Sequence, residues 1–244
     1  MNEILRSLWA RKSHRVYEDR PIEDEAKQLI LESALQAPSA GNMALFSIID
    51  VTDQPLKDKL AISCDNQPFI ANASMVLVFL ADYQRWLDAF EEAGLEPRTP
   101  GEGDLLLAMS DTLIAAQNTV VAAESLGIGS CYIGDIIENY EYHKELLNLP
   151  DHAMPVAMLV FGYPTDQQFA REKPKRYRVE DICHQNAYNR ASKEQLNELM
   201  AIQQNKQGDA LENWLKAFCE RKYNSDFSIE MSRSAHEIIK AWCK

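Results

Sequence analysis

Apolar positions at helical spacing predict that the chain opens with two helices. The stripe within residues 2–13 consists of Ile4, Leu5, Leu8 and Trp9. Residues 22–38 begin with acidic side chains and carry a second apolar stripe. This second helix is expected to end before Pro38, because the residue that precedes a proline avoids the helical conformation.

Short apolar runs without a polar side predict buried strands. Three such runs occupy residues 45–52, 73–82 and 154–164, and residues 130–136 form a shorter strand and turn. Residues 73–82 are apolar almost throughout, which is typical of a strand covered on both faces.

The longest helix is predicted in residues 104–130. Apolar residues cover most of its surface, so it is expected to be central and buried, with Gly127 as its stop. The segment before it starts as a helix at residue 84, and glycine and proline then predict an exposed loop over 94–103. Another helix is expected over residues 140–151.

Helices first, and then strands interleaved with helices, indicate a three-layer α+β or α/β domain. From about residue 191 the chain is polar and helical, and it carries few apolar residues. The bulky ones are Trp214, Phe218, Phe227, Met231 and Trp242. A segment with bulky residues but little core of its own usually packs on another surface, and a partner subunit is one candidate.

Composition narrows the function classes. The 244 residues carry a formal net charge of -12, which argues against general nucleic-acid binding. No apolar run approaches a membrane span, and the first residues mix charges into their apolar stretch, so cytosolic residence is the default. The five cysteines show no CxxC spacing, so neither a zinc site nor a disulfide framework is expected.

The first candidate binding motif is Arg11-Lys12-Ser13-His14-Arg15. Alternate residues of an extended segment can point at one anion, and arginine supplies a planar fork of donors. By itself this motif is also typical of a solvated basic turn.

Three further polar stretches stand out. Residues 37–46 predict a loop with exposed backbone amides, although an ordinary connection would look the same. Residues 125–135 are rich in glycine, but they run helix, turn, strand, which is the reverse of a Rossmann fingerprint. Residues 171–178 form the densest basic patch.

Together, the four stretches resemble one family, the flavin-dependent nitroreductases. The resemblance runs from about Arg6 to Tyr188, and its most specific part is Ala-Ala-Gln-Asn, then Gly-Ile-Gly, then Tyr-Ile-Gly within residues 115–134. The last part of the chain resembles the extension of the larger, NADPH-preferring branch. The resemblance implies a three-layer α/β/α fold with a mixed, mainly antiparallel sheet. It also implies a domain over 1–190 and a helical extension over 191–244 that packs on the domain or on the partner subunit.

The resemblance further implies that FMN binds without a covalent bond at a homodimer interface. Arg11, Lys12 and Ser13 would then face its phosphate and ribityl end. Arg15 would reach the N1/C2=O edge of the ring, where a cation stabilises the negative charge of the reduced flavin.

Other cofactor contacts are implied by matching positions. The loop Ser39, Ala40, Gly41 and Asn42 would reach toward the other subunit's flavin, and the amide of Gln67 would pair with the N3/O2 edge. The remaining matching positions are Tyr132 and Ile133 on one ring face, Gly134 and Asp135 with backbone N–H groups toward N5, and Arg176 with Lys173 or Lys175 on the phosphate.

The implied activity is ping-pong transfer of two electrons from NADPH or NADH to nitroaromatics, quinones, azo compounds or free flavin. No metal and no catalytic side chain are implied. The alternatives are a flavin reductase that supplies reduced FMN, a cofactor-processing enzyme on the same scaffold, and a non-enzymatic anion-binding protein.

Some positions depart from the family or remain open. Many members have Gln-Pro-Trp after the loop asparagine, whereas this chain has Met43-Ala44-Leu45. Arg221, Lys222 and Arg233 are candidates for the 2′-phosphate of NADPH, but a surface helix would carry the same charges. His14 and His184 are expected to be structural.

Overall fold

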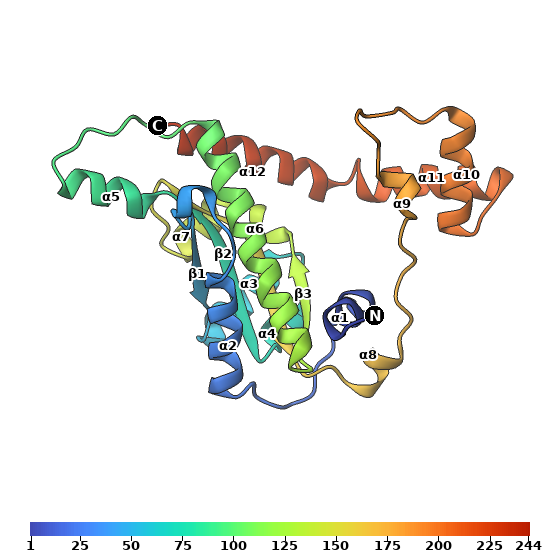
Figure 1. The fold of residues 1–244 in the computed structure, drawn as a ribbon, viewed down its shortest axis with the longest axis horizontal. Helices are drawn as coiled ribbons and strands as arrows, with labels where there is room; N and C mark the ends of the chain where they lie inside the picture. Colours follow the sequence, from blue (N-terminus) through green and yellow to red (C-terminus); the bar gives the residue numbers. More distant parts are fainter. The chain divides into compact units, whose positions relative to one another are not determined.

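Four antiparallel strands form the centre of the fold. The computed structural model describes residues 1–244 (Figure 1), and its strand order is β1-β2-β4-β3. The strands are β1 (Phe46–Asp50), β2 (Met75–Asp82), β3 (Gly129–Ile133) and β4 (Ala153–Gly162). All three pairings are antiparallel. The predicted α+β fold is confirmed, and each predicted strand is present.

The chain divides into two units. The first contains Met1–Arg171 and Glu230–Lys244, and the second contains Glu172–Ile229. The helices of the first unit are α1 (Glu3–Ala10), α2 (Asp24–Leu35), α3 (Gln54–Ser63), α4 (Pro68–Ala71), α5 (Gln84–Glu92), α6 (Glu102–Ser125), α7 (Tyr140–Leu146) and α8 (Asp166–Ala170). Two short 3-10 helices are η1 (Ala40–Asn42) and η2 (Asp135–Ile137).

The second unit contains only helices. They are α9 (Val179–Ile182), α10 (Lys193–Gln204) and α11 (Gly208–Lys222), and α12 (Asp226–Trp242) begins there and ends in the first unit. Ile238 and Trp242 of α12 are buried in a core cluster of the first unit. The end of the predicted extension therefore packs on the domain, whereas the proposed division at residue 190 stays a prediction.

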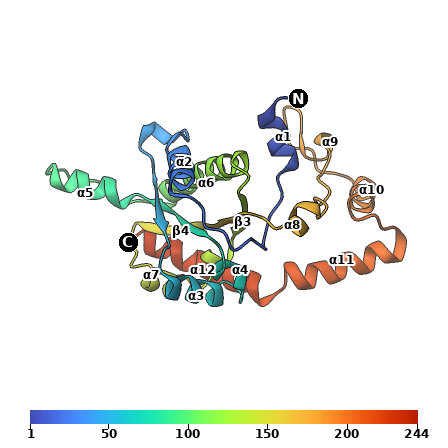
Figure 2. The ribbon, with the colours of Figure 1, turned by 90° about the horizontal axis from the view of Figure 1, so that it is seen from below.

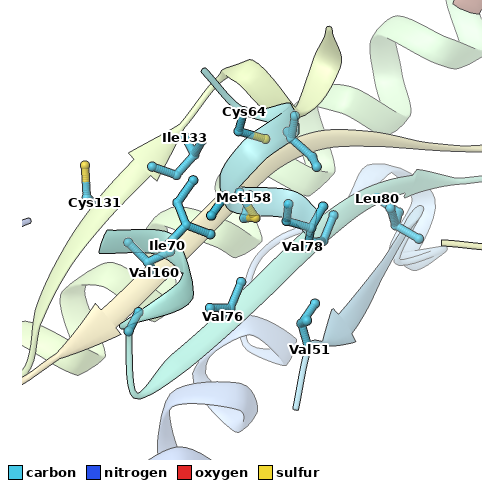
Figure 3. Close-up of a cluster of buried hydrophobic side chains, with 14 of the residues drawn as sticks. Val51, Cys64, Ile70, Val76, Val78, Leu80, Cys131, Ile133, Met158 and Val160 are labelled. Atoms are coloured by element: carbon cyan, nitrogen blue, oxygen red, sulfur yellow. The ribbon is translucent and has the colours of Figure 1, made fainter. Parts of the chain in front are cut away.

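Helices cover both faces of the sheet, which gives three layers. α2 and α6 lie on one side of the strands, and α3, α4 and α7 lie on the other (Figure 2). The first core packs Ile30 and Val120 against Leu77 and Phe161 of the sheet. The second packs α3 and α4 against the opposite faces of β2 and β4, with Val76, Val78, Met158 and Ile70 in one cluster (Figure 3).

Two helices are less buried than the sequence indicates. α6 buries residues such as Ala108 and Val120 on one side, but Leu106 and Leu113 on its other side are exposed, so it is not buried all round as predicted. α1 has no buried residue at all. α6 is also long and apolar enough to cross a membrane by length and composition, and 44% of its most apolar stretch is buried in the protein.

Candidate functional site

The basic segment Arg11–Arg15 lies along the free edge of β3. Ser13 forms a parallel bridge with Ser130, and the His14 N–H donates to the Ser130 carbonyl at 3.0 Å. Tyr17 forms a further bridge with Pro164. The segment is therefore extended, and consecutive side chains point to opposite sides, as in a strand.

Two glycines allow this close approach. Gly129 and Gly162 face each other across β3 and β4. A Cβ atom on Gly129 would lie 2.5 Å from Pro164 Cγ and 2.8 Å from His14 Cδ2, and one on Gly162 would lie 2.7 Å from Tyr17 Cγ. Side chains at these positions would thus push the basic segment off the sheet.

His14 fills the space beside Gly129 and is buried, with 2% of its surface exposed. Burial, assisted by the charges of Lys12, Arg171 and Arg11, lowers the pKa of His14 to about 4. The imidazole is therefore neutral at physiological pH, which agrees with the structural role expected for it.

The two arginines of the motif lie beside aromatic rings of other predicted site segments. The Arg11 guanidinium lies 5.9 Å from the centre of the Tyr132 ring, and Arg15 lies 5.9 Å from that of Phe69, close to Gln67 in the chain. Arg11 Nε and Nη2 are shielded from solvent and have no hydrogen-bond partner. Shielded guanidinium donors without an acceptor are costly, so an anion at this place would be favourable.

Lys12 points elsewhere in this structure. Its ammonium donates to the carbonyls of Phe169 at 2.6 Å and Arg171 at 2.5 Å, and the Arg171 guanidinium donates back to the Ser13 carbonyl at 2.9 Å. These bonds fasten the end of α8 to the basic segment, so Lys12 has a structural role besides the expected phosphate contact. Arg171 was not among the predicted site residues.

The other basic cluster belongs to the second unit. Lys173, Lys175 and Arg176 follow Arg171 directly in the chain, and Lys175 Nζ donates to the Ile202 carbonyl at 3.2 Å. Their meeting with the Arg11–Arg15 segment on one phosphate stays a prediction.

A buried aspartate holds the loop of Ser39 to Asn42. Asp111 on α6 is 4% exposed, and its carboxylate accepts the Ala40 N–H at 3.0 Å and the Leu45 N–H at 3.3 Å. Ser39 Oγ accepts the Ala44 N–H at 3.0 Å. Asp111 was not among the predicted site residues. An acidic residue among the apolar positions of a core helix is the sequence signal by which it could have been found.

The ends of two elements supply the remaining predicted contacts. Gln67 precedes α4, and its Nε2 donates to the Cys64 carbonyl at 2.8 Å. Gly134 follows β3 and caps η2, so its N–H has no acceptor inside that helix. A Cβ atom built on Gly134 meets nothing within 4 Å, which leaves open space beside it.

Comparison with known proteins decides the family. Residues 8–163 match the model of the Nitroreductase family. The chain belongs to the nitroreductase family. An FMN reductase [NAD(P)H] of Bacillus subtilis is 33% identical over 98% of this chain and its own full length. The structure of NfrA2 from B. megaterium has a TM-score of 0.82 at 30% identity and covers 100% of this chain and 99% of its own.

A third similar protein was solved with a nicotinamide nucleotide. The NADPH:FMN oxidoreductase from Vibrio harveyi, complexed with NAD+, has a TM-score of 0.82 at 27% identity and covers 98% of both chains. The predicted membership of the nitroreductase family is thus confirmed, and the fold of the chain is that of its members.

The loop after Asn42 has a backbone that proline could not adopt at position 44. Ala44 stands where many members have proline, and its φ is +47°. Proline is locked near -65°, so it could not adopt this conformation. Trp86 Nε1 and Arg85 instead hold the loop by donating to the carbonyls of Met43 and Ala44.

One candidate for NADPH binding is already engaged. The Arg233 guanidinium forms ion pairs at 2.8 Å with both Glu141 and Glu230. Two carboxylates on one guanidinium leave a net negative group, which does not favour a phosphate. Arg221 and Lys222 lie in the last turn of α11 in the second unit, and their role stays open. His184, also in the second unit, packs its ring on Tyr188 with centroids 4.8 Å apart.

Proposed function

We propose that this nitroreductase is an FMN-dependent oxidoreductase that accepts hydride from NAD(P)H, with NADPH preferred, and reduces planar aromatic compounds. Relatives named FMN reductase [NAD(P)H], oxygen-insensitive NADPH nitroreductase and NADPH-flavin oxidoreductase support this activity. The acceptors we propose are nitroaromatics, quinones, azo compounds and free flavin.

The observation that carries the proposal is the shielded guanidinium of Arg11. Its Nε and Nη2 lack any protein acceptor and lie beside the Tyr132 ring, so the residues present fit an anionic cofactor with a flat ring. Such a cofactor would supply the reversible two-electron chemistry that no side chain here provides. The same donors would satisfy a phosphate through charge-assisted hydrogen bonds.

The residues of this chain bind and orient rather than react. Arg11 and Ser13 would hold the phosphate and ribityl end, with Lys12 next to them, while Arg15 would place a positive charge at the ring edge. The amide of Gln67 and the N–H of Gly134 would orient the ring by hydrogen bonds. Residues that hold a substrate and a cofactor in this way would supply no nucleophile, because proximity and electrostatics would lower the barrier.

The full site is proposed to form in a homodimer in the cytoplasm. Both α1 and α6 of the first unit, which contact each other, carry exposed apolar side chains. They are Ile4, Leu8 and Trp9 on α1, and Leu106, Leu113 and Ile114 on α6. Large exposed apolar side chains are typical of protein–protein interfaces, and the loop of Ser39 to Asn42 lies in the same unit.

Arg15→Ala tests the site. We expect about tenfold weaker FMN binding, which is about 1.4 kcal/mol, or a lower reduction potential, because the substitution removes a cation from the ring edge. Arg20→Ala is the matched control, since the Arg20 guanidinium is already paired with Glu23 at 2.9 Å and stacked on Tyr163.

Flavin content, the dissociation constant of FMN and the potential of the bound flavin would be measured for both variants and the native chain. A colourless native protein that takes up no FMN would refute the proposed function. Equal values for Arg15→Ala and the native chain would refute the role of Arg15. Reduction of free FMN without reduction of nitroaromatics, quinones or azo compounds would favour the flavin-supplying alternative.

A further inference from the structure

A buried histidine outside the predicted site joins two segments of that site. His143 on α7 is fully buried, with 0% of its surface exposed. Its Nε2 lies 2.7 Å from Ser63 Oγ, and its Nδ1 lies 3.0 Å from the Ile136 carbonyl. Both ring nitrogens are therefore engaged, each by a different element.

The partners define the tautomer. A backbone carbonyl only accepts, so Nδ1 must carry the proton and donate it to Ile136. In the neutral ring Nε2 is then an acceptor, and the Ser63 hydroxyl donates to it. Burial lowers the pKa of His143, which keeps the imidazole in this neutral form.

Each end of the bridge leads directly into a predicted cofactor contact. Ser63 is the last residue of α3, and the chain runs from it through a tight turn to Gln67. Ile136 lies in η2, which Gly134 caps. The bridge thus connects the segment expected at the N3/O2 edge of the ring with the segment expected at N5.

The turn between Ser63 and Gln67 is held from outside as well as by its own residues. Asp65 and Asn66 both have positive φ values, +62° and +50°, which aspartate and asparagine tolerate better than most residues. A second bond on the same side comes from Asn139, whose Nδ2 donates to the Ser63 carbonyl at 3.3 Å.

We propose that His143 is a positioning residue that sets the spacing between Gln67 and Gly134, and through it the orientation of the bound flavin. This inference rests on the proposed function. The ring itself makes no contact with the expected cofactor atoms; it acts through the Ser63 hydroxyl and the Ile136 carbonyl. Preorganised sites depend on such supporting contacts, because small displacements of binding groups are costly.

Ser63→Ala and His143→Asn interrupt the bridge at the same link. The asparagine Nδ2 can replace the Nδ1 donor toward Ile136, but it cannot reach Ser63. We therefore expect both variants to weaken FMN binding or slow hydride transfer about tenfold. We also expect the two-electron potential of the bound flavin to shift by about 30 mV, which corresponds to a tenfold change in the ratio of the affinities for oxidised and reduced flavin. The double variant should add little to either single one, because the two substitutions remove one interaction.

The matched control is Ser125→Ala, which removes an exposed hydroxyl whose only bond is to the Ala122 carbonyl of its own helix. FMN affinity, the potential of the bound flavin, its visible spectrum and thermal unfolding would be measured for all variants. Lower thermal stability with native affinity, spectrum and potential in Ser63→Ala and His143→Asn would overturn the inference, and so would fully additive effects. A native chain that binds no FMN would instead refute the proposed function, so the two failures are distinguishable.

Discussion

Glu138 directly follows η2 and is buried, with 7% of its surface exposed. Oε1 of its carboxyl group has no hydrogen-bond partner. Burial, followed by the negative charges of Asp135, Asp65 and Glu230, raises the pKa of Glu138 from 4.5 to about 7. The perturbation to make is Glu138→Gln, which keeps the shape of the protonated acid and removes its titration.

The magnitude follows from the two pKa values. In the unfolded chain Glu138 loses its proton near pH 4.5, whereas in the folded protein it keeps the proton until about pH 7. Over this window the folded state binds more protons than the unfolded state, so the free energy of unfolding falls as the pH rises. The difference between the two pKa values corresponds to about 3 kcal/mol.

Urea unfolding of the native chain and of Glu138→Gln, at several pH values between 4 and 8, measures this effect. We expect nearly equal stability at pH 4 and a variant about 3 kcal/mol more stable at pH 8. Other titrating groups cancel in the comparison, because both proteins contain them. The exposed Glu91→Gln serves as the control and should leave the profile unchanged. Parallel pH profiles for the native chain and Glu138→Gln would refute the reasoning.

Two further substitutions test the backbone around the site. Gly129→Ala should lower the free energy of unfolding by about 1–3 kcal/mol, because its Cβ would meet Pro164 at 2.5 Å; an unchanged urea midpoint would show that the basic segment is not held against the sheet there. Ala44→Gly should raise the thermal midpoint by relieving a positive φ of +47° that costs alanine about 1 kcal/mol, and a lower midpoint would contradict the strained loop.

The sequence predicted the elements better than their surroundings. The strand over 73–82 was predictable because its apolar run is continuous, and β2 is buried along its whole length. The helix over 104–130 was predicted to be buried all round, yet Leu106 and Leu113 are exposed. An apolar pattern shows that a face avoids water, but it does not show whether this chain or another covers it.

The candidate site shows the same limit. The motif Arg11–Arg15 is contiguous and could be found by its charges, whereas its pairing with Ser130 depends on the folded sheet. No sequence pattern links Ser63 with His143, because they lie on different helices. Only folding brings Ser63 Oγ to 2.7 Å from His143 Nε2. Contacts between residues far apart in the sequence leave no local signal, so these positions required the structure.

The basic segment also has a consequence for solubility. β3 is an outer strand, and an uncovered outer strand offers free N–H and C=O groups on which another chain can pair and aggregate. The bridge from Ser13 to Ser130 occupies part of this edge, and the bridge from Tyr17 to Pro164 lies just past the end of β4. The segment proposed to hold the cofactor therefore also covers part of the sheet edge, so substitutions that loosen it would favour aggregation as well as weaken cofactor binding.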